Sequence, residues 1–104
     1  MNTIIVIKNI VDQCATKDTG LTLYEQLRSM LTDSANITLD FKGMDKFSHT
    51  FFNVSIGRLI IEMKDENITS KIKLINLSET GQLVYSHSVE NAKVLLKSIK
   101  AKDI

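Results

Sequence analysis

The stretch ITLDFKGMDKFSHTFFNVSIGRLIIEM, residues 37–63, predicts a strand, a turn and a helix in succession. Apolar residues alternate with polar ones over residues 37–41, as is typical of a strand with one buried face. The pair Lys42-Gly43 indicates a turn, because glycine adopts a positive φ at little cost. Ser48 is a natural N-cap, and apolar residues recur after it at helical spacing up to about Met63.

The helix predicted over residues 48–63 carries a buried stripe that a glycine interrupts. The stripe consists of apolar residues at helical spacing and comprises Phe52, Ile56, Leu59, Ile60 and Met63. Gly57 lowers helix propensity by roughly 1 kcal/mol relative to alanine. We therefore expect Gly57 to mark a close contact between this helix and the sheet that tolerates no side chain.

The segments on either side extend the alternation of strands and helices. Upstream, the apolar, β-branched run at residues 3–7 predicts a buried strand. A helix follows it, capped by Thr22, which has capping-box spacing with a glutamate, or by a residue one turn earlier. Downstream, a polar loop at residues 65–70 leads to a third strand near residues 72–75.

The C-terminal segment predicts a helix from Ser88 onward, whereas residues 79–87 fit either a helix or a helical turn with an irregular link. The order β-α-β-α-β-α favours a small, open, mostly parallel sheet with helices packed on it. A length of 104 residues with 43% hydrophobic content suits one hydrophobic core. We therefore expect a single α/β domain over residues 1–104.

Charge and cysteine content restrict the partners and the compartment. The formal net charge is +1, which provides no broad positive field for nucleic acid. Cys14 is the one cysteine, so an internal disulfide is excluded and a reducing compartment is favoured. The apolar run at the N-terminus is far too short to span a membrane. We expect a cytoplasmic protein that binds neither nucleic acid nor membrane.

The sequence contains no known catalytic motif and no known metal-binding motif. His49 and His87 lack the spacing of two ligands on one helix. Asp40 and Asp45 could approach one cation, but two carboxylates without further oxygen ligands make a weak case. Asp40, at the end of a strand, is better suited to bonding the backbone amides of the next loop. We expect no enzyme activity, no cofactor and no metal.

The segment LDFKGMDKFSHTFFNVSIGRL, residues 39–59, resembles the hallmark of the STAS-like family, small bacterial domains related to anti-sigma-factor antagonists. That hallmark is a strand ending in Leu-Asp-Phe, a glycine turn, a short apolar step and a Ser/Thr-Phe pair that opens a helix. The matching residues here are Leu39, Asp40, Phe41, Gly43, Met44, Phe47, Thr50 and Phe51. The resemblance extends over about residues 20–77 and implies a STAS-like fold.

The resemblance also implies a role in signal transduction. In the better-known antagonists, a kinase phosphorylates a serine or threonine at this helix start, and only the unphosphorylated form binds the partner. The matching acceptor is Thr50, with Ser48 as the alternative register. The relatives have a glycine directly after the acceptor, where this chain has Phe51. The implied partner is a regulator of the histidine-kinase ATPase type.

We therefore predict a regulatory protein–protein interaction site over residues 45–54. Its partner-binding residues are Asp45, Lys46, His49, Phe51 and Asn53, and its loop is structured by Asp40 and Gly43. Two alternatives stay open: Ser48 and Thr50 serve only as helix caps, or the crevice at the strand ends senses a small molecule or nucleotide. A homodimer through paired sheet edges also stays open.

Overall fold

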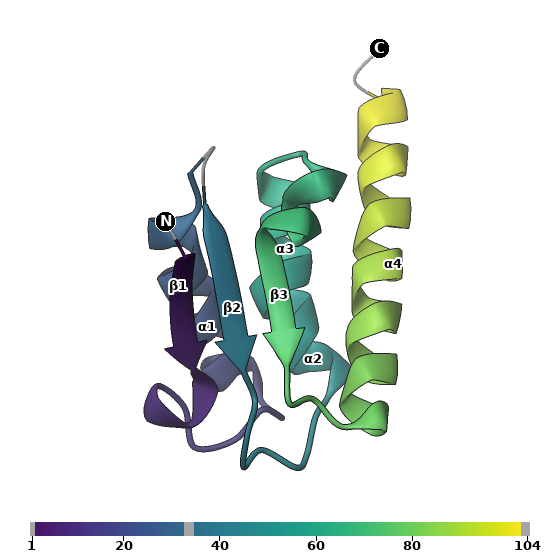
Figure 1. Ribbon diagram of the computed structural model, residues 1–104. Helices are drawn as coiled ribbons and strands as arrows, with labels where there is room; N and C mark the ends of the chain where they lie inside the picture. Colours follow the sequence, from purple (N-terminus) through teal and green to yellow (C-terminus); the bar gives the residue numbers. More distant parts are fainter. Residues whose placement is uncertain (1, 33–34, 103–104) are drawn as a thin grey trace.

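The computed structural model describes residues 2–32 and 35–102, and it contains a three-stranded sheet with helices behind it and beside it (Figure 1). In chain order the elements are β1 (Asn2–Val6), η1 (Ile7–Asn9), α1 (Lys17–Met30), β2 (Asn36–Asp40), α2 (His49–Phe52), η2 (Asn53–Gly57), α3 (Arg58–Glu62), η3 (Glu66–Lys71), β3 (Ile72–Ile75) and α4 (Glu79–Lys102). The segments η1 and η3 are 3₁₀-helices, and η2 is a π-helical turn.

The sheet is entirely parallel, with the strands in the order β1-β2-β3. In its register, Ile5 lies beside Leu39, which lies beside Leu74. The side chains on the helix-covered side form the core, where Ile5, Ile37, Leu39 and Ile72 are buried. The predicted α/β class and mostly parallel sheet are thus confirmed. None of the helices within the described residues is long and apolar enough to cross a membrane.

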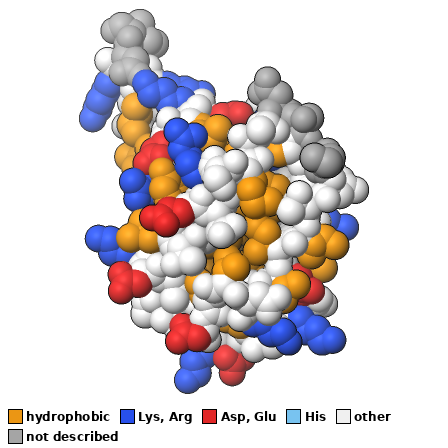
Figure 2. Space-filling view, turned by 90° about the vertical axis from the view of Figure 1, so that its left-hand side faces the viewer, with side chains coloured by type: hydrophobic (Ala, Val, Ile, Leu, Met, Phe, Trp, Pro, Cys, Tyr) orange, Lys and Arg blue, Asp and Glu red, His pale blue; other side chains and the backbone are white. Residues whose placement is uncertain are grey.

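The edge of the sheet at β1 has no neighbouring strand among the described residues. Figure 2 views the molecule from this side, where hydrophobic side chains occupy the middle of the face and charged ones lie mainly toward its margins. Ile4 in this strand is 66% exposed. The predicted strand at residues 3–7 is present, but it is an edge strand whose first half is exposed.

Helix α1 begins earlier than the capping-box spacing predicted. Its N-cap is Thr16, whose hydroxyl accepts a hydrogen bond from the backbone N–H of Thr19 at 3.3 Å. Thr22 lies inside the helix and its hydroxyl donates to the carbonyl of Asp18 at 3.2 Å. The prediction that Thr22 or the residues one turn before it cap the helix is therefore wrong. Gln13 supports the true cap, because its side-chain amide donates to the Thr16 hydroxyl at 2.9 Å.

The helix predicted over residues 48–63 is present as α2, η2 and α3 in direct succession. The π-helical turn in its middle contains Ser55, whose buried hydroxyl donates to the carbonyl of Phe51 at 2.8 Å. Two details of the predicted stripe are wrong. Met63 is 37% exposed, and Gly57 faces α4 instead of the sheet, since a Cβ there would lie 3.7 Å from the Cβ of Ala92.

The C-terminal helix α4 is continuous through residues 79–87, which settles the alternative that the sequence left open. Ser88, from which the sequence predicted a helix, is a buried residue inside α4. The N-terminus of α4 is capped by Ser78, whose hydroxyl accepts from the N–H of Gly81 at 3.1 Å. The polar stretch at residues 65–70, predicted to be a loop, is largely the 3₁₀-helix η3. Helix α4 packs on α2, η2 and α3.

Candidate functional site at the start of helix α2

The start of α2 is anchored to the segment that precedes α1. The backbone N–H of Ser48 donates to the carbonyl of Cys14 at 3.2 Å, and Phe47 forms an isolated parallel bridge with Cys14. The Ser48 hydroxyl donates to the carbonyl of Ala15 at 2.9 Å and accepts from the N–H of Phe51 at 3.1 Å. Ser48 is half-buried, and its hydroxyl is both the cap of α2 and a tether to the neighbouring loop.

Cys14 lies beneath this junction and is completely buried. Burial raises the pKa of its thiol to about 12. Because the thiolate is the reactive form of cysteine, this raised pKa disfavours reaction of the thiol in the folded protein. Cys14 therefore belongs to the packing beneath the site.

Thr50 is placed very differently, although it is only two residues from Ser48. It is exposed in the first turn of the helix. Within the described part of the chain, no residue forms a hydrogen bond with its hydroxyl. Of the two candidate acceptors, Thr50 is thus the one that a second protein could reach without first breaking a contact of the fold.

Phe51 is completely buried, so the prediction that its ring contacts a partner is wrong. Its ring packs edge-to-face against Phe52 with centroids 5.1 Å apart. Helix α1 lies directly on this residue, because a Cβ on Gly20 would come within 2.7 Å of the Phe51 carbonyl oxygen. The bulky side chain of Phe51 therefore points into the core and is not part of the outer surface.

The remaining predicted partner-binding residues are exposed: Asp45, Lys46, His49 and Asn53. His49 stacks on His87 of α4 with ring centroids 5.8 Å apart and planes 9° from parallel. The carbonyl of His49 accepts a hydrogen bond from the Ser88 hydroxyl at 3.4 Å. His87 is a residue of this surface that the sequence did not indicate, because its place depends on how α4 packs against α2.

The loop before α2 is held by Asp40. Its Oδ1 accepts from the side-chain amide of Asn76 at 2.8 Å and from the N–H of Lys42 at 3.0 Å. These two hydrogen bonds lower the pKa of the Asp40 carboxyl, and the bond from Asn76 has the larger effect. Gly43 has a φ of +86°, which favours glycine. Asn76 was not singled out from the sequence, and it ties the loop to the end of β3.

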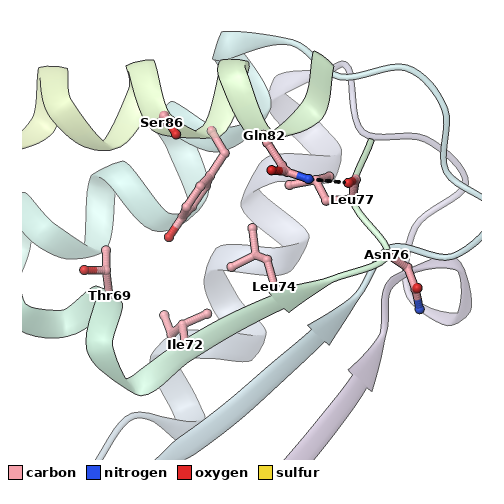
Figure 3. Close-up of a pocket in the computed structure, with 8 residues that line it drawn as sticks. Thr69, Ile72, Leu74, Asn76, Leu77, Gln82 and Ser86 are labelled. Carbon is pink, nitrogen blue, oxygen red and sulfur yellow. Dashed lines mark hydrogen bonds between the residues drawn. The ribbon is translucent and has the colours of Figure 1, made fainter. Parts of the chain in front are cut away.

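In the part of the chain that the structure describes, the geometry gives no support for a metal site, and the depression beside the loop before α2 is small for a ligand. Among the described residues, no group of three His, Cys, Asp or Glu side chains is placed to hold a metal ion. A depression bounded by Asp12, Gly43 and Asp45 measures about 80 Å³, whereas ligand pockets usually measure about 300–1,000 Å³. A larger groove of about 440 Å³ lies between β3 and α4 (Figure 3).

Comparison with known proteins identifies the part of the chain that forms this site. Residues 20–82 match the family model described as the STAS-like domain of unknown function (DUF4325). The match covers more than half of the chain and includes most of α1, the whole α2–α3 segment and the start of α4. No curated protein and no solved structure is significantly similar to the chain.

Proposed function

We propose, from the premise that this chain belongs to the family of STAS-like domains, that it is a non-enzymatic regulatory module that docks a partner protein through the start of α2. The docking surface consists of Asp45, Lys46, His49, Thr50 and Asn53, with His87 beside them. All six are exposed, and three of them, His49, Thr50 and Asn53, belong to the α2–η2 segment. The fold holds this surface in place from its inner side, where the Ser48 hydroxyl forms hydrogen bonds with the backbone of Ala15 and Phe51. The buried ring of Phe51 packs on Phe52.

Thr50 is the switch in this proposal. The observation that carries it is the contrast between the exposed, uncommitted hydroxyl of Thr50 and the doubly hydrogen-bonded hydroxyl of Ser48. A phosphate on Thr50 would add nearly two negative charges. A partner surface fitted to a small neutral hydroxyl would then meet a bulky, hydrated dianion, and burying it unpaired would cost much of the affinity. The phosphorylated form is therefore the released form.

The partner class follows from the resemblance to anti-sigma-factor antagonists and is a regulator of the histidine-kinase ATPase type. The buried single cysteine suits a reducing compartment, so we place this interaction in the cytoplasm. The near-neutral net charge gives no reason to invoke nucleic acid or a membrane surface.

The experiment compares Thr50→Ala and Thr50→Glu as immobilised baits in extract from the source organism. Quantitative mass spectrometry measures how much of a histidine-kinase-type ATPase each bait retains. We expect the wild type and Thr50→Ala to retain it and Thr50→Glu to retain at least tenfold less. Thr80→Glu is the matched control, because Thr80 is also an exposed threonine in the first turn of a helix. Equal retention by both Thr50 variants contradicts the switch, and retention of no such ATPase by any bait contradicts the partner class.

A further inference from the structure

A groove separates the outer edge of β3 from helix α4 (Figure 3). It measures about 440 Å³ and is lined by Ile72 and Leu74 of β3 and by Gln82, Tyr85 and Ser86 of α4. None of the described residues that line it is charged. Helix α4 therefore does not close the edge of the sheet, although it runs alongside β3.

The backbone of Leu74 presents hydrogen-bonding groups to this groove. The carbonyl of Ile75 accepts from the N–H of Phe41, so Ile75 directs its backbone groups toward β2. Successive residues of a strand direct these groups to opposite sides, so Leu74 directs its N–H and C=O away from β2. The N–H of Ile72 also points outward, but it already donates to the carbonyl of Thr69. Among the described residues, the carbonyl of Ile72 and both backbone groups of Leu74 have no hydrogen-bond partner, so they can pair with another molecule.

The opposite wall of the groove is fixed in place. Tyr85 packs edge-to-face on the buried ring of Phe52, with centroids 5.3 Å apart. The side-chain amide of Gln82 donates to the carbonyl of Leu77 at 2.9 Å, which Figure 3 shows as a dashed line. Ser86 is exposed on the same side of α4. The groove thus has an edge strand on one side and a rigid, uncharged helix face on the other.

We propose that this groove binds an extended, uncharged peptide segment of a partner protein, which adds to β3 as a fourth strand. Only a polypeptide backbone supplies donors and acceptors at the spacing of a strand edge, and strand addition between an edge strand and a helix is an established mode of peptide recognition. The four residues of β3 span roughly 13 Å at about 3.3 Å per residue. The peptide therefore pairs over about four residues. This surface is distinct from the one around Thr50, so it goes beyond the proposed switch.

The first experiment selects peptides from a phage-displayed library on the full chain and measures the affinity of one labelled synthetic peptide by fluorescence polarisation. Ser86→Lys places a charge in the groove and should weaken binding at least tenfold. Asn91→Lys is the matched control, because Asn91 is exposed on α4 but lines a different depression, next to Gly57. Selection of no peptide, or equal weakening by both variants, overturns the proposal. Thr50→Glu should leave this affinity unchanged, which separates the outcome from that of the Thr50 switch.

The second experiment tests the backbone pairing itself. N-methylation of the peptide at one set of alternating residues should abolish binding, and methylation of the other set should be tolerated, since only one set faces β3. In hydrogen exchange followed by NMR, the bound peptide should slow the Leu74 amide at least tenfold and leave Lys73 and Ile75 unchanged, because those two already face β2. Equal tolerance of both methylated peptides, or unchanged exchange at Leu74, overturns the proposal.

Discussion

The inner and outer faces of the helical segment at residues 48–62 perform different tasks. On the inner face, Ser48 and Ser55 donate hydrogen bonds to backbone carbonyls, and Phe51 is completely buried. On the outer face, His49 and Thr50 are exposed. Some residues of this segment therefore stabilise the fold, while their immediate neighbours in the chain form the proposed docking surface. Substitutions on the two faces should separate the free energy of unfolding from partner binding.

The largest effect on stability is expected where α1 meets the inner face. In Gly20→Ala the new Cβ would lie 2.3 Å from Cγ2 of Val54 and 2.7 Å from the carbonyl oxygen of Phe51. The backbone oxygen cannot turn aside, so the helices must separate. Overpacking of this kind costs about 1–3 kcal/mol, more than the roughly 1 kcal/mol that alanine gains in helix propensity. Because both distances are below 3.0 Å, the cost should lie at the upper end of that range, which leaves a net loss of about 2 kcal/mol, measured by urea denaturation.

Gly57→Ala is the matched control for this substitution. Its Cβ would meet nothing closer than the Phe52 carbonyl oxygen at 3.4 Å and the Ala92 Cβ at 3.7 Å. These distances approach ordinary van der Waals contact, so the gain in helix propensity should largely offset them and stability should change by less than about 1 kcal/mol. Equal losses of stability in Gly20→Ala and Gly57→Ala would show that the contact between α1 and the inner face is no tighter than the contact at Gly57.

A smaller effect is expected from the two hydroxyls at the start of α2. Ser48→Ala removes the N-cap and the hydrogen bond to Ala15, which should cost about 0.5–2 kcal/mol in the free energy of unfolding. Thr50→Ala removes an exposed hydroxyl without a hydrogen bond to the described residues, and its effect should stay within about 0.5 kcal/mol. Both values come from denaturant titrations under one set of conditions. A cost for Thr50→Ala as large as that for Ser48→Ala would remove the distinction between the two faces.

The strands and helices were predictable because their signals are local. The alternation at residues 37–41 gave β2, and the helical spacing after Ser48 gave the α2–α3 segment, with Phe52, Ile56, Leu59 and Ile60 buried as predicted. The register around Phe51 was not predictable. The burial of Phe51 depends on the close approach of α1, whose Gly20 lies against the Phe51 backbone, and spacing within residues 48–63 does not indicate this contact.

Contacts between distant parts of the chain also explain why the sequence left residues 79–87 of the C-terminal helix ambiguous and did not indicate His87 at the site. Gly81 and the serines near it have weak helix propensity, but Gly81 is buried against Leu77 and Phe47, where a Cβ would lie within 3.0 Å of both side chains. Tertiary packing therefore favours helix where local propensity does not. The stacking of His87 on His49 joins residues that are far apart in the sequence, and no spacing rule could indicate it.

The smallest effect is expected at Asp40, which positions the loop leading to the outer face. Hydrogen bonds from Asn76 and Lys42 lower the pKa of its carboxyl from the ordinary value of 3.8. A carboxyl with a lowered folded-state pKa stabilises the protein above its unfolded-state pKa and loses this contribution as the pH falls through the folded-state value. The wild type should therefore exceed Asp40→Asn in thermal midpoint at pH 6, and the difference should shrink below about pH 4. A difference between wild type and Asp40→Asn that stays constant from pH 6 to pH 2 would mean that the charge of Asp40 does not hold the loop.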